Sequence, residues 1–210
     1  MKKILFAFMV LQVTSLAVFG QIESQQFIKK HLVRASASIV SGYMYKSNIK
    51  NVHLNGNLEY YIDNKVSIRG DYNILLGSDG LTDQYMGLKD DHNVMLGAVF
   101  HIQTKGYFDP YIILQPGIGY TSSYIELPST MIANGESNKK YYEGVLSPVG
   151  SAGIGFNYYF QRFAHLFMET RYMYGQHLSK APSPISLEEL RITFGLGFNV
   201  FVIKDKKKPA

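Results

Sequence analysis

The sequence predicts an all-β protein: a transmembrane, antiparallel, eight-stranded up-and-down β-barrel. Three observations predict this fold. Eight segments alternate apolar and polar residues with the two-residue period of a β-strand. The connections between these segments are alternately short and long, as in barrels with turns at one end and loops at the other. Aromatic residues gather near both ends of the strands, on the apolar face.

The N-terminus precedes the predicted barrel. It has a basic start at Lys2 and Lys3, an apolar run over 4–19 and a small residue at Gly20. This pattern predicts a secretory signal peptide over residues 1–20, cleaved after Gly20. A retained membrane anchor is the alternative, although the run is near the lower limit for crossing a bilayer. We therefore expect export, a barrel over residues 21–203 and a basic periplasmic tail over 204–210.

Composition and charge exclude several kinds of function. The chain has no cysteine, so disulfides and thiolate metal sites are excluded. Its formal charge of +5 falls to zero when the +2 of the leader and the +3 of the tail are subtracted, so no nucleic-acid partner is expected. The six histidines are scattered, and the carboxylates at 77–80 and 87–93 form no complete calcium loop. We expect those two segments to be solvated loops, and we expect no metal and no cofactor.

The first four strands begin with the segment from His31 to Tyr45. Their apolar faces are Val33, Ala35, Ala37, Ile39, Tyr43 and Tyr45; Val52, Leu54, Leu58, Tyr60 and Ile62; Val66, Ile68, Tyr72 and Ile74; and Val94, Leu96, Ala98, Phe100 and Ile102. Their polar faces are Arg34, Ser36, Ser38 and Gly42; His53, Asn55, Asn57 and Glu59; Ser67, Arg69, Asp71 and Asn73; and Asn93, Gly97, His101 and Gln103. Met95 and Val99 are apolar exceptions on the fourth polar face.

The last four strands repeat the pattern. Their apolar faces are Ile112, Leu114, Ile118 and Tyr120; Ala152, Ile154, Phe156, Tyr158 and Phe160; Leu166, Met168, Tyr172 and Tyr174; and Leu190, Ile192, Phe194, Leu196, Phe198, Val200 and Val202. Their polar faces are Tyr111, Gln115, Gly117, Gly119 and Thr121; Ser151, Gly153, Gly155 and Asn157; His165, Glu169 and Arg171; and Arg191, Thr193, Gly195, Gly197 and Asn199.

A water-soluble sandwich or lipocalin-like barrel would also alternate, but its polar face would meet water and carry many long charged side chains. Here the polar faces are rich in Gly, Ser and Asn, with one or two charges per strand and almost no Lys. Small polar residues suit a narrow enclosed lumen. The apolar faces are therefore expected to contact lipid.

The lengths of the connections between the strands favour an outer-membrane barrel. Those expected to be short are Asp63–Lys65, Thr104–Asp109 and Gln161–Phe163, and those expected to be long are Gly77–Asp91, Ser122–Pro148 and Gln176–Glu188. The first connection, Lys46–Lys50, is short where a long one is expected. Short turns at one end and long loops at the other are typical of outer-membrane barrels, whose short turns lie in the periplasm.

Ten aromatic residues on the apolar faces are expected to form two interfacial girdles. The outer girdle is Tyr43, Tyr45, Tyr120, Tyr172 and Tyr174, and the inner girdle is Tyr60, Phe100, Tyr158, Phe160 and Phe198. A general preference of aromatics for strands would explain their presence, but not their sorting to the strand ends.

Seven inward-facing ionisable residues are expected to pair inside the lumen. They are Arg34, Arg69, Arg171 and Arg191 against Glu59, Asp71 and Glu169. Four positive and three negative charges can pair almost completely, and such a network would plug and brace the barrel. The alternative is a gated, narrow ion path in which the bridges swap partners. Gly195 and Gly197 leave room for neighbouring side chains in so narrow an interior.

These features resemble the small eight-stranded barrels of the outer-membrane protein A and porin-like superfamily, over about Gln26 to Ile203. The last strand, "GLGFNVFVI", resembles the β-signal read by the barrel-assembly machinery, although a basic tail follows it. The resemblance includes no peptidoglycan-binding domain. It implies a monomer in the outer membrane, surrounded by lipid and lipopolysaccharide, with a non-enzymatic role in envelope integrity and loops available for surface contacts.

One stretch points to chemistry instead. "HLSKAPSPISLEEL", residues 177–190, resembles a segment of outer-membrane lipid A deacylases. That resemblance implies His177 as general base, Ser179 as nucleophile and Glu188 or Glu189 as the orienting acid. Lys180 stands where that family has asparagine, and the parity of the seventh strand turns His177 toward the lumen. A lipid A hydrolase and a conduit for small solutes or hydrophobic ligands are the alternative functions.

Overall fold

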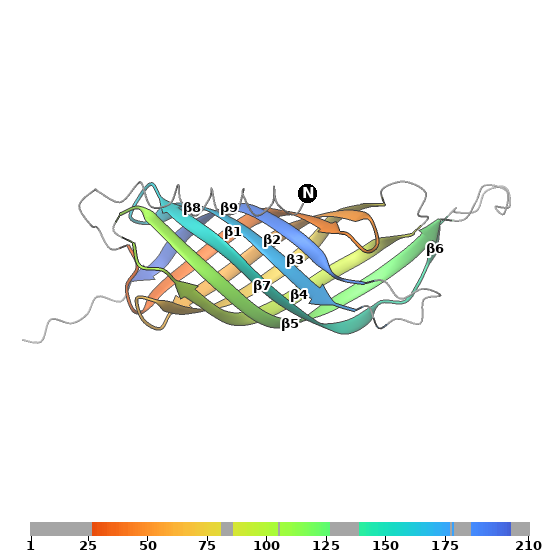
Figure 1. Ribbon diagram of the computed structural model, residues 1–210, viewed down its shortest axis with the longest axis horizontal. Helices are drawn as coiled ribbons and strands as arrows, with labels where there is room; N and C mark the ends of the chain where they lie inside the picture. Colours follow the sequence, from red (N-terminus) through yellow and green to blue (C-terminus); the bar gives the residue numbers. More distant parts are fainter. Residues whose placement is uncertain are drawn as a thin grey trace, which may run out of the picture.

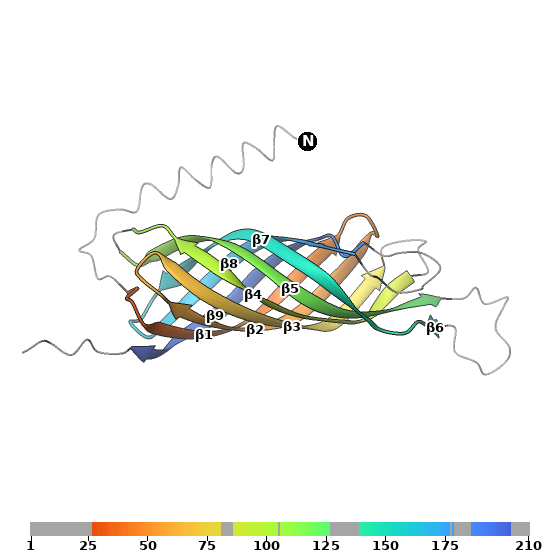
Figure 2. The same cartoon turned by 90° about the horizontal axis from the view of Figure 1, so that it is seen from below.

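The computed structural model describes residues 27–80, 86–104, 106–126, 139–176, 178 and 186–202. The predicted signal peptide, the predicted tail, His177 and Ser179 lie outside the described residues. Eight long strands form a closed, tilted barrel, and a ninth short strand extends it at one end (Figures 1 and 2). The described residues contain no helix long and apolar enough to cross a bilayer.

The strands follow one another around the barrel in chain order. They are β1 (Leu32–Met44), β2 (Ile49–Tyr61), β3 (Val66–Gly80), β4 (Met86–His101), β5 (Phe108–Glu126), β6 (Lys139–Tyr141), β7 (Val145–Tyr159), β8 (Ala164–Gly175) and β9 (Glu189–Val202). All pairings are antiparallel, and β1 pairs with both β2 and β9, which closes the sheet. β6 pairs only with the last residues of β5. The prediction of a closed eight-stranded antiparallel barrel is confirmed.

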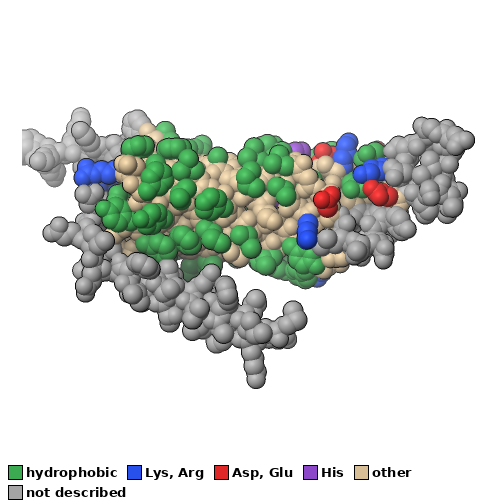
Figure 3. All heavy atoms as spheres, turned by 90° about the horizontal axis from the view of Figure 1, so that it is seen from above, with side chains coloured by type: hydrophobic (Ala, Val, Ile, Leu, Met, Phe, Trp, Pro, Cys, Tyr) green, Lys and Arg blue, Asp and Glu red, His purple; other side chains and the backbone are tan. Residues whose placement is uncertain are grey.

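Residue parity decides which side chains enter the lumen. In β2, buried and exposed residues alternate without interruption along the whole strand. Apart from Lys50 and Gly56, the exposed positions of β2 are apolar. Leu58 on β2 and Phe194 on β9 are 63% and 61% exposed. The apolar side chains cover the barrel wall, whereas charged side chains lie toward the two ends (Figure 3). The outer wall is therefore the apolar surface, and the lumen is the polar interior, the reverse of a water-soluble barrel.

The two ends of the barrel differ. The terminal end holds residues 27–31, the last residues of β9 and the turns at 62–65, 102–104, 106–107 and 160–163. The loop end holds β6 and the connections at 45–48 and 142–144. At the first terminal-end turn, the Asp63 carboxylate accepts hydrogen bonds from the backbone N–H groups of Lys65 (2.6 Å) and Val66 (2.8 Å). These two donors hold the pKa of Asp63 below its ordinary value.

Two of the expected long loops are partly strand. β3 continues to Gly80 and β4 begins at Met86, so the expected loop Gly77–Asp91 is wrong for most of its length. β5 likewise continues to Glu126 and β7 begins at Val145, which shortens the expected loop Ser122–Pro148. The backbone ladder persists there, with Gly87 paired to Tyr124, although the apolar and polar faces are no longer distinct. Side-chain alternation reports an apolar surface on one face, so it does not detect a strand that continues beyond that surface.

Candidate functional site in the barrel lumen

The lumen holds a dense set of buried charges. The buried cations are Arg34, Arg69, Arg171 and Arg191, and the buried carboxylates are Glu59, Asp71, Asp91, Asp109, Glu169 and Glu189. All seven residues expected to form an inward network are therefore inside. Three carboxylates and two histidines, His53 and His101, join them. The groups form three clusters along the barrel axis.

The terminal cluster consists of Arg34, Glu59, His101 and Asp109. Arg34 Nη1 lies 3.3 Å from Glu59 Oε2, and its Nη2 lies 3.7 Å from Asp109 Oδ2. The His101 ring lies between the same two carboxylates, with its nitrogens 3.0 Å from Glu59 Oε1 and 2.9 Å from Asp109 Oδ1. Arg34 also donates to the hydroxyl of Tyr159. This cluster ties together β1, β2, β4, β5 and β7 near the terminal end.

The central cluster consists of Arg69, Asp71, Glu169 and Arg171, with Gln115 among them. Arg69 bonds Asp71 Oδ1 and Glu169 Oε2, both at 3.0 Å, and Arg171 bonds Asp71 Oδ1 at 3.2 Å and also Glu169. Gln115 donates to Asp71 Oδ2 (2.6 Å) and accepts from Arg171 Nη1 (2.6 Å). Because β3 and β8 lie on different sides of the barrel, these bonds cross the lumen.

The loop cluster consists of His53, Asp91, Glu189 and Arg191. Arg191 Nη2 lies 3.1 Å from Asp91 Oδ2, and Arg191 also bonds Glu189 through Nε. His53 Nε2 lies 2.9 Å from the same Asp91 oxygen. Asn51 donates to Glu189 Oε1 at 2.8 Å. Asp91 lies in β4, so the expectation that residues 87–93 form a solvated loop is wrong for this residue: its side chain is buried in the lumen.

His53, Asp91 and Glu189 bring possible metal-ligand atoms within 4.8 Å of one another. However, the Arg191 guanidinium bonds both carboxylates and lies 3.4 Å from His53 Nε2. A metal ion bound by these three residues would have to displace that cation or accept its repulsion. The trio is therefore better described as an arginine site than as a metal site.

Little space remains between the clusters. A cavity of about 10 Å³ lies between the central and loop clusters, and Arg171, Arg191, Asn55 and Thr193 are among its lining residues. This volume accommodates about one water molecule. Inward apolar side chains such as Val99 and Ile113 fill part of the rest. The described lumen is thus packed with side chains along its length.

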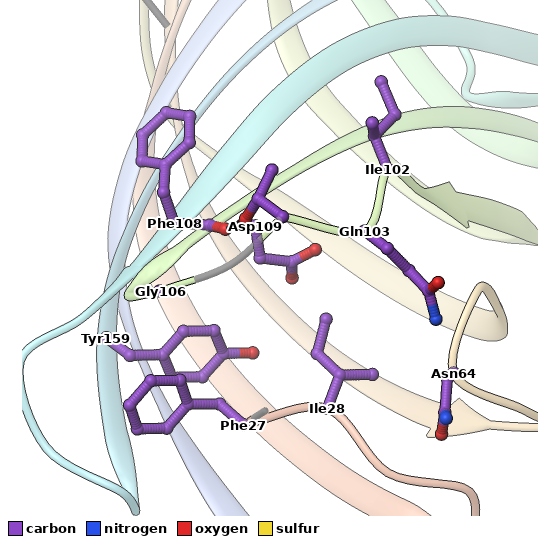
Figure 4. A pocket seen from close by; sticks show the side chains of 10 residues that line it. Phe27, Ile28, Asn64, Ile102, Gln103, Gly106, Phe108, Asp109 and Tyr159 are labelled. Carbon is purple, nitrogen blue, oxygen red and sulfur yellow. Dashed lines mark hydrogen bonds between the residues drawn. The ribbon is translucent and has the colours of Figure 1, made fainter. Parts of the chain in front are cut away.

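The terminal end is partly covered by the segment that enters β1. The ring of Phe27 stacks on that of Tyr159, with centroids 4.8 Å apart and an interplanar angle of 5°. Figure 4 shows these rings beside a crevice whose lining includes Ile102, Phe108 and Asp109. The crevice has a volume of about 30 Å³. It reaches Asp109 of the terminal cluster from the outside.

The hydrolase hypothesis offers two candidate acids, Glu188 and Glu189. Their surroundings differ. Glu189 faces the lumen and bonds Arg191 and Asn51. Glu188 lies at the outer rim, where it accepts hydrogen bonds from Tyr45, Tyr172 and Lys46. These three donors lower the pKa of Glu188 to about 2, and the bond from Lys46 has the largest effect. Since each carboxylate is already paired, neither is poised to orient a histidine.

The ten aromatic residues expected to form girdles all have exposed side chains on the outer wall. Four of these residues make specific polar contacts. Tyr43 donates to Asn48 Oδ1 at 2.9 Å, and the hydroxyls of Tyr45 and Tyr172 lie 2.9 Å apart. At the terminal end, the Tyr60 hydroxyl lies 2.6 Å from His31 Nδ1.

Sequence reasoning missed Asp91, Asp109, Glu189, His53 and His101 as members of the network. Asp91 and Asp109 were assigned to a loop and a turn. A parity signal for them did exist, because Asp91 shares its parity with inward Asn93 and His101, and Asp109 shares its parity with inward Tyr111. Their partners could not be found in this way, since pairing across the lumen depends on the tilt of the strands.

Comparisons with known proteins identify the fold. No protein-family model and no curated protein matches this chain. Among solved structures, the barrel is similar to the outer membrane protein OprG from Pseudomonas aeruginosa (16% identity, TM-score 0.56, covering 82% of this chain and 97% of that one). It is also similar to Neisserial surface protein A (15%, 0.54, 80% and 96%) and to the N-terminal β-barrel domain of Pseudomonas aeruginosa OprF (16%, 0.53, 80% and 97%). The expected resemblance to small eight-stranded outer-membrane barrels is confirmed at the level of fold.

Proposed function

We propose that this chain is an integral outer-membrane protein with a closed barrel and a non-enzymatic role in envelope integrity. The apolar outer wall supports insertion, because a continuous band of exposed Leu, Ile, Val and aromatic side chains would be unfavourable in water. The fold shared with outer-membrane barrels supports the same location. The proposal includes export through the signal peptide over 1–20, assembly by the barrel-assembly machinery, and contact with lipid and lipopolysaccharide.

The central cluster is the observation that carries this proposal. Arg69 on β3 bonds Glu169 on β8, and Gln115 on β5 bonds both Asp71 and Arg171, so charged side chains from two strands and an amide from a third meet across the lumen. Opening a passage would separate these buried pairs, and removing one partner of a buried pair typically costs about 3–5 kcal/mol. The geometry therefore favours a braced, closed barrel over a conduit.

The loop end supplies the surface for outside contacts. Glu126 on β5 and Lys139 on β6 form an ion pair with their charged atoms 3.2 Å apart. The Lys89 ammonium lies over the ring of Tyr141. The described charged side chains at this end are Lys46, Lys50, Lys89, Lys139 and Lys140 against Asp79, Asp90, Glu126, Glu143 and Glu188. Five positive charges balance five negative charges. A surface of this kind is suited to polar contacts without strong attraction to either sign of charge.

The structure around Glu188 and Glu189 does not favour the hydrolase hypothesis. It needs Glu188 or Glu189 as the orienting acid, and each is held by other donors. The contact of Glu188 with Tyr45, Tyr172 and Lys46 instead fixes the start of β9 against the turn after β1.

A deletion strain tests the proposal. Cells without the protein should become more sensitive to detergent and to large hydrophobic antibiotics, and the wild-type chain should restore resistance. Ser179→Ala is the matched variant: it should restore resistance fully, with lipid A unchanged by mass spectrometry. If Ser179→Ala reaches the outer membrane at the wild-type level but fails to restore resistance, and lipid A changes with the wild-type chain, the protein is a hydrolase.

A further inference from the structure

The described lumen holds three buried histidines that differ in their carboxylate partners. His101 contacts two carboxylates, His53 contacts one and His165 contacts none. From this series we infer that His101 is doubly protonated at neutral pH, as an imidazolium that clamps the terminal end of the barrel, and that the barrel has a proton-dependent lock facing the periplasm. The protonation of His101 does not depend on the proposed envelope role, whereas the periplasmic orientation of the lock rests on the proposed outer-membrane location.

The geometry of His101 requires two ring protons. Its Nε2 lies 3.0 Å from Glu59 Oε1, and its Nδ1 lies 2.9 Å from Asp109 Oδ1. A neutral imidazole has one N–H and one lone pair, so one of its nitrogens would direct a lone pair at a carboxylate. The imidazolium donates from both nitrogens. These are charge-assisted hydrogen bonds, which are stronger than bonds between neutral groups.

The charge balance of the terminal cluster agrees with this assignment. Arg34 and an imidazolium at His101 supply two positive charges, against the two negative charges of Glu59 and Asp109. With a neutral His101, the buried cluster would keep one uncompensated negative charge, which is costly in a low-dielectric interior. Opposite charges within 4 Å also favour the charged form of the ring.

The other groups that face His101 are neutral, apart from Arg69 further into the lumen. Tyr61 of β2 and Tyr111 of β5 place their rings 4.7 Å and 5.8 Å from the imidazole, measured between centroids. Ser67 of β3 has its Oγ 3.0 Å from Nε2. On β7, Asn157 donates to Asp109 Oδ2 at 2.7 Å and Tyr159 bonds Arg34. None of these groups supplies a further positive charge to the two carboxylates.

The other two histidines provide internal comparisons. His53 Nε2 faces Asp91, while its Nδ1 is buried without a hydrogen-bond partner, so only one of its nitrogens has an acceptor. Both ring nitrogens of His165 are buried without partners, and its ring lies beside those of Tyr159 and Phe167. A second proton on either ring would be buried without an acceptor. Only His101 has an acceptor for each nitrogen.

The clamp, formed by Glu59, His101 and Asp109, lies beside a crevice at the terminal end, so the pH outside the barrel can affect it. Glu59, His101 and Asp109 belong to β2, β4 and β5. Asp109 lines the crevice at the terminal end (Figure 4). In the proposed orientation that crevice opens to the periplasm. Loss of the second ring proton at high pH would place Glu59 and Asp109 beside a neutral ring. The terminal end should then loosen, while the loop end keeps its own ion pairs.

Nitrogen-15 NMR of the imidazoles, with the mature barrel in lipid nanodiscs, tests this inference. At pH 8 an ordinary histidine, with a pKa of about 6.5, is mostly neutral. We expect one ring to show two protonated nitrogens at that pH, and we expect His101→Gln to remove its signals while His53→Gln does not. If His101→Gln fails to fold, His31→Gln, His53→Gln, His92→Gln, His165→Phe and His177→Gln assign the ring by elimination. A neutral pattern for His101 at pH 8 overturns the inference.

A stability measurement gives a second readout. Between pH 7 and pH 10, the thermal midpoint of the wild-type barrel should fall by several degrees, and His53→Gln should fall by the same amount. His101→Gln should start lower and change little over this range. An equal fall in the wild type and in His101→Gln would exclude His101 as the lock.

Discussion

Arg171 of β8 and Arg191 of β9 lie directly opposite each other in the strand register, with both side chains in the lumen. Like charges in this position are normally destabilising. Here each arginine has a glutamate two residues earlier in its own strand, Glu169 and Glu189, and an aspartate across the lumen, Asp71 and Asp91. The repeated Glu-x-Arg pattern therefore neutralises a pair that would otherwise repel.

Glu169→Gln should destabilise the barrel, because it leaves Arg69 and Arg171 with Asp71 as their only carboxylate. Removing one partner of a buried ion pair costs about 3–5 kcal/mol. Urea unfolding of the detergent-folded barrel measures the loss. Lys65→Ala, at an exposed turn residue, is the control and should change the free energy of unfolding by less than about 0.5 kcal/mol. Equal stability of both variants would contradict a bracing role for the central cluster.

Gln115→Ala should also weaken the barrel, since it leaves one oxygen of Asp71 and one nitrogen of Arg171 without this partner. Leaving buried polar groups unsatisfied costs about 1–3 kcal/mol, and more for charged groups. The same urea titration checks this. Combined with Glu169→Gln, the effect should be less than additive, because both changes act on one network. Strict additivity would indicate that Gln115 and Glu169 act independently.

Gly97→Ala should destabilise, whereas Gly56→Ala should not. A Cβ on Gly97 would lie 2.1 Å from the backbone oxygen of Leu114, so β4 and β5 would have to move apart. Overpacking of this kind costs about 1–3 kcal/mol. A Cβ on Gly56, on the outer wall, would meet nothing within 4 Å. Comparing the two unfolding midpoints tests the close approach of β4 and β5, and an unaffected Gly97→Ala would argue against it.

The hydrogen bonds that Glu188 accepts from Lys46, Tyr45 and Tyr172 should weaken at low pH. The pKa of this carboxyl is lowered from 4.5 to about 2 by Lys46, Tyr45 and Tyr172. A carboxyl with a lowered pKa stabilises the folded form above its unfolded value, and that contribution is lost as the pH falls from about 4.5 to about 2. The protection of the backbone amides at 45–48 against hydrogen exchange, relative to unstructured peptide at the same pH, should therefore decrease as the pH falls over this window in the wild type. In Glu188→Gln the protection should be lower at neutral pH and independent of this titration; identical protection in both proteins would contradict the contact.

The sequence predicts the inside and outside of each strand well, because the lumen and the outer wall impose opposite polarities on alternate residues. Parity placed Arg34, Glu59 and Arg171 in the lumen, where the structure has them. It could not supply their partners. Arg69 and Glu169 are one hundred residues apart in the chain and meet only because of the tilt and closure of the strands.

The alternation of apolar and polar residues also fails to predict a strand where it extends beyond the apolar outer wall. Ser122 and Ser123 are both buried polar residues at the loop end of β5, so the pattern there resembles that of a loop. For the same reason Asp91 and Asp109, near strand ends, were not recognised as lumen residues. The separation of Glu188 from Glu189, by contrast, follows from the parity of β9, in which Arg191 faces inward and its neighbours face outward.

Single-channel recording in a planar bilayer is the most direct test of a closed, braced barrel. The purified mature protein is reconstituted at neutral pH, and current is measured under an applied voltage before and after the central cluster is disrupted by Gln115→Ala with Arg171→Ala. We predict no stepwise conductance for the wild type, and discrete openings only for the double variant if it folds. Regular openings of the wild-type protein would contradict the account and establish the lumen as a conducting path.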